Sequence, residues 1–186
     1  MALAVAGLLA AAQGAEAPPV LPGDSLYRLP ITIESAAGGH RALGDFRGQP
    51  VLVTMFYAHC ASVCPILTSE LQLLDERLSP TDRRGIRVLM VSLDSERDTP
   101  EALASFAAAH RITDPRWTVG RVPHNDVRPL AASLGIRYRP LPGGEIEHST
   151  VIVLLDADGV PRARTSGLLV SQDDFLDSVL RAVRGH

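Results

Sequence analysis

The chain has 186 residues, of which 46% are hydrophobic and 21% are charged, and its formal net charge is -3. A chain of this length and composition can bury the core of one globular domain. No basic stripe interleaved with aromatic residues is present in the sequence. We therefore expect no nucleic-acid partner, because such partners require a clustered positive surface.

The N-terminus has the pattern of an export signal. An apolar run from Ala2 to Ala12 is followed by Ala15-Glu16-Ala17, which matches an A-x-A cleavage site. The run is too short to span a membrane comfortably, and the alternative is a disordered, alanine-rich tail. We predict a signal peptide or anchor segment at residues 1–17, which allows membrane association, then a Pro-rich linker at 18–25 and the folded domain at 26–186. The expected location is the periplasm or another extracytoplasmic compartment, where two thiols can form a disulfide.

Apolar runs predict the strands in chain order. Residues 51–57 form a continuous apolar run of strand length, as expected for a buried central strand, and 86–93 and 150–156 are predicted to be a second and a third strand. A shorter strand is predicted at 31–33, and the segment 38–50, GGHRALGDFRGQP, is predicted to be loop and turn. Asp158-Gly159 is a turn sequence, so the chain after 150–156 should return as a hairpin.

Helices are predicted between and after these strands. Four leucines at helical spacing follow the first buried strand, namely Leu67, Leu71, Leu74 and Leu78. Thr99-Pro100-Glu101 provides a cap, an N1 proline and an acidic first turn for a helix that ends near His110. A shorter helix is predicted at 126–134, and Ser171 should cap a last helix with Phe175, Val179 and Leu180 on one face.

The resulting order is β-α-β-α-β-β-α. It predicts an α/β domain in which a mixed central sheet is flanked by helices, with a reactive pair at the carboxyl end of a central strand. That order is thioredoxin-like.

The chain has two cysteines, Cys60 and Cys64, in a C-x-x-x-C spacing directly after the first buried strand. If the helix begins near Ser62, Cys60 precedes it and Cys64 lies in its first turn, which rises about 5.4 Å per turn. A disulfide is then feasible, since it needs Cα atoms roughly 4.4–6.8 Å apart. The helix N-terminus also favours the thiolate form, which binds metals and attacks disulfides. The alternative is a purely structural disulfide, although so short a loop removes little chain entropy.

Two thiolates are soft ligands that select Cu(I), but two ligands rarely complete a metal site. The chain offers six histidines as a third ligand. His148 is the preferred one, because it precedes the third buried strand, and the loop at that position faces the cysteine loop in a thioredoxin-like sheet. His124, in a predicted loop, and His59, which should point to the opposite face, rank behind it. The others are a loop residue, a helix end and the C-terminus, namely His40, His110 and His186.

Four stretches resemble the Sco/SenC family of copper-binding proteins. They are LGDFRGQPVLVTMFYAHCASVCP, VLMVSLDSERDTPEAL, LAASLGIRYRP and EIEHSTVIVLLDADG, and they cover most of residues 24–180. The resemblance implies a thioredoxin-like fold and copper, as Cu(I) or Cu(II), held by Cys60, Cys64 and His148. It also implies a role in assembling the CuA site of cytochrome c oxidase. The implied partners are the oxidase subunit that carries this site, and other copper chaperones or thiol oxidoreductases.

Two acidic residues, Asp94 and Asp98, match acidic positions of the family and are interpreted as supporting loop residues rather than ligands. The chain departs from many family members inside and before the cysteine loop. It has Ala61-Ser62 where they have Pro-Asp, and Ala58-His59 where they have Thr-His or Thr-x. Neither departure involves an expected ligand, so they bear on partner specificity rather than on copper binding.

We therefore predict a copper chaperone rather than an enzyme. The alternative is a thiol-disulfide oxidoreductase that keeps the cysteines of a partner reduced, and a third hypothesis is an exported binding module without redox activity. Redox enzymes of this fold usually carry C-x-x-C and a cis-proline just before the third strand. This chain has Glu147-His148-Ser149 there, which favours metal binding, although the first two roles are compatible.

Overall fold

The computed structural model describes residues 20–60, 63–165 and 173–185, and for Val63 and Cys64 it describes the backbone alone. The predicted export signal, the helix-capping Ser171 and the terminal His186 lie outside these residues. Among the helices that the structure describes, none is long and apolar enough to cross a membrane.

A seven-stranded mixed sheet forms the centre of the domain, in the order β2-β1-β5-β4-β3-β8-β9. Its three central strands β5, β4 and β3 are parallel, while β8 runs antiparallel to β3. A separate antiparallel pair, β6 with β7, lies beside this sheet. The strands are β1 (Thr32–Ser35), β2 (His40–Ala42), β3 (Val51–Phe56), β4 (Arg87–Ser92), β5 (Trp117–Arg121), β6 (Tyr138–Pro140), β7 (Ile146–His148), β8 (Ile152–Leu155) and β9 (Pro161–Arg164).

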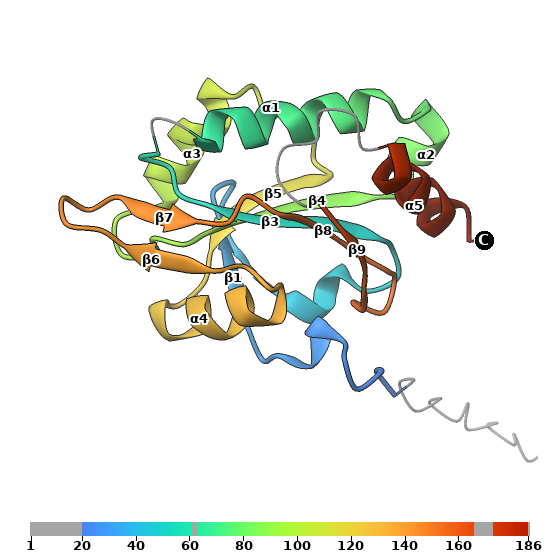
Figure 1. The fold of residues 1–186 in the computed structure, drawn as a ribbon, viewed down its shortest axis with the longest axis horizontal. Helices are drawn as coiled ribbons and strands as arrows, with labels where there is room; N and C mark the ends of the chain where they lie inside the picture. The colour runs from blue at the N-terminus through green and yellow to red at the C-terminus, as the bar shows by residue number, and fades with distance from the viewer. Residues whose placement is uncertain (1–19, 61–62, 166–172, 186) are drawn as a thin grey trace, which may run out of the picture.

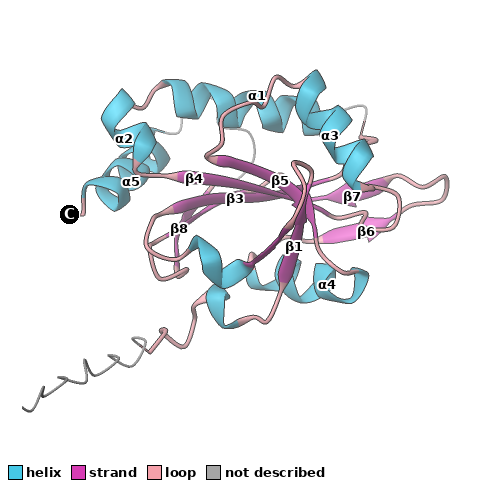
Figure 2. Ribbon diagram, turned by 180° about the vertical axis from the view of Figure 1, so that it is seen from behind, coloured by secondary structure: helices cyan, strands magenta, loops and turns pink. Residues whose placement is uncertain are grey.

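Helices cover both faces of the sheet (Figures 1 and 2). Four lie on one face, namely α1 (Val63–Glu76), α2 (Pro80–Arg84), α3 (Pro100–Ala109) and α5 (Asp173–Arg184). The other face carries α4 (His124–Ser133) and two short 3-10 helices, η1 (Leu26–Arg28) and η2 (Leu43–Phe46). The arrangement confirms the predicted α/β layers.

The strongest sequence patterns correspond to elements of the structure. All six residues of β3 are buried, as a central strand covered on both faces requires. Three leucines of α1, namely Leu67, Leu71 and Leu74, are buried in the core, and Leu78, just beyond the helix, is buried with them. Thr99 caps α3 as predicted, since its side chain accepts a hydrogen bond from the amide of Ala102 at 3.3 Å.

Several short elements were not predicted. The segment 38–50, expected to be loop, contains β2 and η2; the residues of β2 are all exposed, so no apolar pattern marks them. Strand β5 and the pair β6–β7 were also missed, and the predicted helix at 126–134 begins earlier, at His124. These strands are short and partly polar. They form because a neighbouring strand provides hydrogen-bond partners: β1 for β2, β4 for β5, and β6 and β7 for one another.

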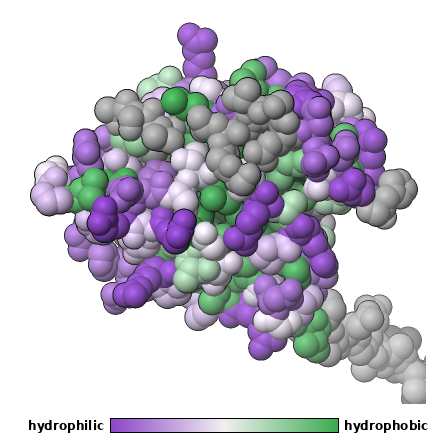
Figure 3. Space-filling model, in the orientation of Figure 1, coloured by the Kyte–Doolittle hydropathy of each residue, from purple (hydrophilic) through white to green (hydrophobic). Residues whose placement is uncertain are grey.

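Hydrophilic side chains dominate the face seen in Figure 3, and hydrophobic ones are scattered among them. The large hydrophobic side chains that the described residues expose are Val20, Ile66 and Leu73. Isolated exposures of this kind are common on protein surfaces. They do not by themselves mark a functional site.

Candidate metal centre

The cysteine loop leaves the carboxyl end of β3. Cys60 is buried, and its amide donates to the carbonyl of Tyr57 at 3.3 Å, which folds the chain into a tight turn after the strand. Helix α1 is described from Val63, so the backbone of Cys64 lies in its first turn. The sequence predicted this placement of the two cysteines, one before the helix and one within it.

Asp98 holds this loop from the segment between β4 and α3. Its side chain is fully buried and accepts hydrogen bonds from the amide of Ala58 at 2.8 Å and from the hydroxyl of Ser92 at 2.5 Å. The same carboxylate lies 3.1 Å from Nδ1 of His59. A buried carboxylate with several donors is a strong anchor, because charge-assisted hydrogen bonds are strengthened where water is excluded. Asp98 therefore fixes the start of the cysteine loop, in the supporting role expected for it.

His148 approaches the same loop from the β6–β7 hairpin. It is the last residue of β7 and pairs with Tyr138 of β6, so it belongs to a strand and not to the loop predicted from the sequence. Its ring meets the ring of Tyr57 edge-on, with centroids 5.9 Å apart. Figures 1 and 2 both place β7 and the start of α1 at the same end of the molecule. The histidine thus contacts the stretch that leads into Cys60.

Two residues that the sequence did not single out help to seat His148. Tyr57 provides the ring contact, and buried Thr54 of β3 donates from Oγ1 to the carbonyl of Val151 at 2.7 Å. The second bond fastens the chain between β7 and β8 to the central strand. Both residues lie in the apolar run that leads to the cysteines, and this position in the sequence is the signal that could have identified them.

The surroundings of His148 favour a neutral imidazole. Burial lowers the pKa of His148, and the nearby carbonyl of Ser149 opposes this only in part. Nδ1 lies 3.3 Å from that carbonyl. When Nδ1 carries the proton, Nε2 presents its lone pair, which is the form that binds a metal ion.

The other histidines within the described residues have different surroundings. His59 turns to Asp98; His110 caps α3, with its ring 4.3 Å from that of Phe106. His124, expected in a loop, is the first residue of α4 and lies 3.8 Å from Glu96, with most of its side chain exposed. His40 is exposed on the edge strand β2. His148 contacts Tyr57 at the end of β3, and its role as third ligand stays a prediction.

Where side chains are described, no three or more of His, Cys, Asp and Glu lie close enough together to hold a metal ion. The side chain of Cys64 is not among them. Cys60, Cys64 and His148 as a ligand set are therefore an expectation, supported by the placement of their elements.

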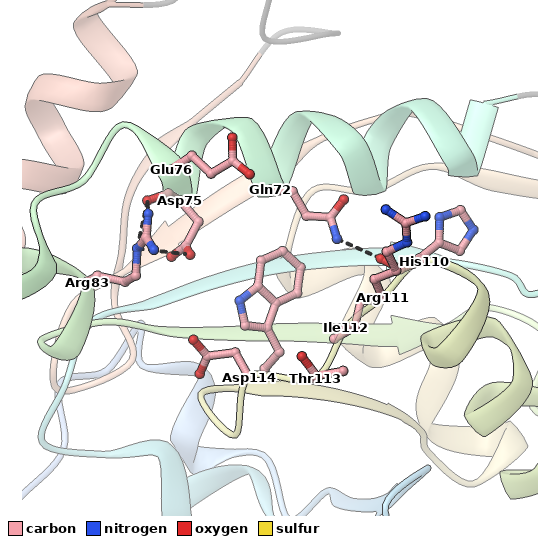
Figure 4. A pocket seen from close by; sticks show the side chains of 10 residues that line it. Gln72, Asp75, Glu76, Arg83, His110, Arg111, Ile112, Thr113 and Asp114 are labelled. Carbon is pink, nitrogen blue, oxygen red and sulfur yellow. Dashed lines mark hydrogen bonds and ion pairs between the residues drawn. The ribbon is translucent and has the colours of Figure 1, made fainter.

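A hollow of about 450 Å³ lies at the other end of α1 (Figure 4). Its polar groups pair with one another: Asp75 lies 3.3 Å from Arg83, and Gln72 donates to the carbonyl of His110 at 2.8 Å. Trp117 lines it at the amino end of β5, opposite the sheet edge that bears the cysteine loop. We interpret this hollow as part of the structural ion-pair network that joins α1, α2 and the α3–β5 loop.

The chain is similar in sequence to several known proteins. The human mitochondrial protein SCO1 homolog is 28% identical over 143 residues, which are 74% of this chain and 46% of that protein. The chain spans about half the length of the first curated relatives that it matches.

Two solved structures show the likeness in three dimensions. ScoI of Bradyrhizobium japonicum with copper bound aligns with a TM-score of 0.70 and 20% identity, covering 82% of this chain and 97% of that one. BsSco, described as a member of the Sco family of cytochrome c oxidase assembly proteins with a disulfide switch, aligns with a TM-score of 0.72 and 22% identity, covering 83% of this chain and 92% of that one. These likenesses confirm the predicted thioredoxin-like fold.

The family is identified by a sequence model. The model of SCO1/SenC matches residues 27–184. That range contains the cysteine loop, the β4–α3 segment with Asp98, and the hairpin with His148. The chain therefore belongs to the SCO1/SenC family.

Proposed function

We propose that this protein is a copper chaperone that carries one copper ion on Cys60, Cys64 and His148. The observation that carries the proposal is the position of the His148 side chain. A half-buried imidazole with a lowered pKa packs on Tyr57, three residues before Cys60. A histidine held in its neutral form beside a C-x-x-x-C loop suits a ligand better than it suits a general acid.

The donor set fits copper in both common oxidation states. Two thiolates are soft ligands that suit Cu(I), while an added imidazole suits Cu(II). Cys60 lies before α1 and Cys64 in its first turn, where the helix dipole favours thiolate. The copper-bound ScoI of Bradyrhizobium japonicum, a relative by fold, supports copper as the cargo.

Delivery to the CuA site of cytochrome c oxidase is the recipient that we propose. The support is membership of the SCO1/SenC family together with BsSco, which belongs to a family of cytochrome c oxidase assembly proteins. The partner would then be the oxidase subunit that carries CuA. Transfer of copper from the loaded, purified chain to the isolated CuA domain, followed by the absorption of the CuA centre, tests this step. A CuA domain that stays empty would contradict it.

Copper uptake in two redox states tests the chaperone role. Reduced protein is expected to bind one copper ion per chain, and protein oxidised beforehand far less, because a disulfide removes both thiolate ligands. The measurement is the copper content after gel filtration, with free thiols counted in parallel. Equal uptake by the oxidised form would exclude the two cysteines as ligands.

A second candidate is a thiol-disulfide oxidoreductase. One thiolate would attack a partner disulfide, and the other would then close the Cys60–Cys64 disulfide; the partner gains two electrons and two protons, and this chain loses them. The disulfide switch described for BsSco favours this candidate. Replacing His148 with Ala separates the two: a chaperone loses Cu(II) affinity, while a pure oxidoreductase changes its exchange rate and keeps its copper binding.

We propose further that the protein works outside the cytoplasm after export through residues 1–17. The support is the apolar run and the A-x-A pattern in that segment. The mature chain is expected to begin near Glu16 or Pro18, which N-terminal sequencing of protein from the exported fraction would show. An intact Met1 start in a cytoplasmic pool would contradict export.

A further inference from the structure

The tip of the β6–β7 hairpin is tied to the body of the protein by Arg97. This arginine lies in the segment between β4 and α3, and its Nη2 donates to the carbonyl of Gly144, in the turn between the two hairpin strands. The carboxylate of Asp94 pairs with the same guanidinium group and orients it. An oriented guanidinium that donates to a carbonyl makes a charge-assisted hydrogen bond.

The residue after Arg97 fastens the other half of the candidate metal centre. Asp98 accepts from the amide of Ala58, at the start of the cysteine loop. Adjacent residues of one segment therefore hold the cysteine loop and the hairpin that carries His148. Asp94 braces this segment as well, because its carbonyl accepts from the amide of Asp98 at 2.8 Å.

The hairpin tip lies beside a groove. A groove of about 690 Å³ separates the hairpin from α4 and the β4–α3 segment, and both Arg97 and Gly144 line it. The hairpin forms a two-stranded sheet of its own, apart from the main sheet, and projects at one end of the molecule (Figure 1). Ile146 is its buried residue, while most of the residues around the tip are exposed. A two-stranded ribbon by itself is marginally stable in water, so its tip depends on outside contacts.

We propose that Arg97 is a positioning residue that latches the β6–β7 hairpin and thereby holds His148 against the cysteine loop. This inference rests on the proposed copper site. His148 lies four residues after Gly144, and its pairing with Tyr138 makes it part of the same short ribbon. Displacement of the tip is transmitted to His148 through that ribbon, whereas the cysteines, which follow β3, are left in place.

Two neighbouring glycines provide a matched pair of variants. Both have left-handed backbone, with φ of +87° at Gly144 and +100° at Gly143, so an alanine is strained at either position. A Cβ at Gly144 would overlap Nη1 of Arg97, whereas a Cβ at Gly143 meets nothing within 4 Å. Gly144→Ala therefore breaks the latch from the hairpin side without touching Asp98, and Gly143→Ala controls for backbone strain.

The first measurement needs no copper. Hydrogen exchange is followed in the reduced apo-protein for wild type, Gly144→Ala, Gly143→Ala and Arg97→Met. Loss of a charge-assisted hydrogen bond at a partly exposed site should raise amide exchange in 138–148 roughly tenfold in Gly144→Ala and Arg97→Met. Gly143→Ala should show a clearly smaller change. Equal exchange in all three variants would overturn the latch.

The second measurement separates positioning from general damage. Cu(II) affinity, which uses the histidine, should fall roughly tenfold in Gly144→Ala and Arg97→Met, while Cu(I) affinity on the two thiolates stays near the wild-type value. In a His148→Ala background the same substitutions should add little, because the group that they position is gone. Equal losses for Cu(I) and Cu(II), or full additivity with His148→Ala, would overturn the role of Arg97. If His148→Ala lowers Cu(II) affinity and the latch variants do not, the copper site stands and the latch fails. A wild-type protein that binds no copper would overturn both.

Discussion

The cysteine loop and the β6–β7 hairpin meet at one end of the molecule, but they are built in opposite ways. The loop continues a fully buried strand, β3, that pairs on both sides in the centre of the sheet, with β4 and with β8. The hairpin has three residues in each strand and pairs within itself. The loop is held by the buried carboxylate of Asp98, the hairpin tip by the partly exposed guanidinium of Arg97.

This difference separates two properties of the proposed copper site. The two cysteines follow a fully buried central strand, so we expect Cu(I) affinity to follow the stability of the core. The imidazole is attached to a peripheral ribbon, so we expect Cu(II) affinity to follow the seating of that ribbon. Peripheral segments open at a lower free-energy cost than core strands. If the two parts are independent, a change in one should alter the affinity for one copper ion more than for the other.

The largest effect is expected at the cysteine loop. Cys60→Ser or Cys64→Ser should lower the affinity for Cu(I) and Cu(II) alike, since each removes a thiolate that both ions use. The loss should exceed the roughly 10–100-fold that removal of a hydrogen-bond partner of a ligand costs. Competition titration with a chelator for each ion measures it. If either variant kept the Cu(I) affinity of wild type, the replaced cysteine would not be a Cu(I) ligand.

The next effect is expected at the hairpin. His148→Ala should lower Cu(II) affinity roughly 100-fold, and Cu(I) affinity much less, because two thiolates already suit Cu(I). His40→Ala is a matched control, since this side chain is exposed on the edge strand β2. The same titrations in both oxidation states provide the measurement. Identical curves for His148→Ala and wild type would remove His148 from the site, and His124 and His59 would be tested next.

A smaller effect is expected when the anchor of the cysteine loop is changed. Asp98→Asn replaces an acceptor of several hydrogen bonds by a group that also donates, so the free energy of unfolding should fall by about 1–3 kcal/mol. Urea unfolding measures this, with Asp177→Asn on the exposed face of α5 as the control. Hydrogen exchange should increase around Ala58 more than in the hairpin. A larger increase in the hairpin than around Ala58 would show that the cysteine loop and the hairpin are not independent of one another.

The smallest effect lies away from both parts, where α5 meets α2. A hydrogen bond from Arg184, with help from the hydroxyl of Ser79, lowers the pKa of Asp82 to about 2. The pair stabilises the fold above the unfolded-state pKa of roughly 4, and this stabilisation is lost as the pH falls through about 2. Asp82→Asn should therefore destabilise the protein near neutral pH and differ less from wild type in acid.

Urea unfolding of wild type and Asp82→Asn at about pH 6 and about pH 2.5 measures this dependence. The copper affinity of Asp82→Asn should equal that of wild type, which makes the variant a control for simple loss of stability. A constant difference in stability between the two pH values would contradict the assignment to the Asp82–Arg184 pair.

Strong local signals in the sequence were enough to predict several elements. The apolar run at 51–57 contains β3, the leucine spacing lies in α1, and the Thr99-Pro100 cap begins α3. The sequence also placed the two cysteines at the strand-to-helix junction and ranked His148 ahead of the other histidines by topology. The elements were predicted correctly because burial and capping act over a few neighbouring residues, whereas His148 as a copper ligand stays a prediction.

Other features depend on residues far apart in the sequence, and they became visible only in the folded protein. Strands β2, β6 and β7 are short and largely exposed, and they form because another strand provides their hydrogen bonds. His148 is therefore a strand residue seated on Tyr57, which its own neighbours in the sequence do not indicate. Asp98 bonds to the cysteine loop and Arg97 to the hairpin tip. These two roles also arise from the fold, because each residue bonds to a partner about 40 or more positions away. Contacts across such separations carry no local periodicity, so they become visible only when the chain has folded.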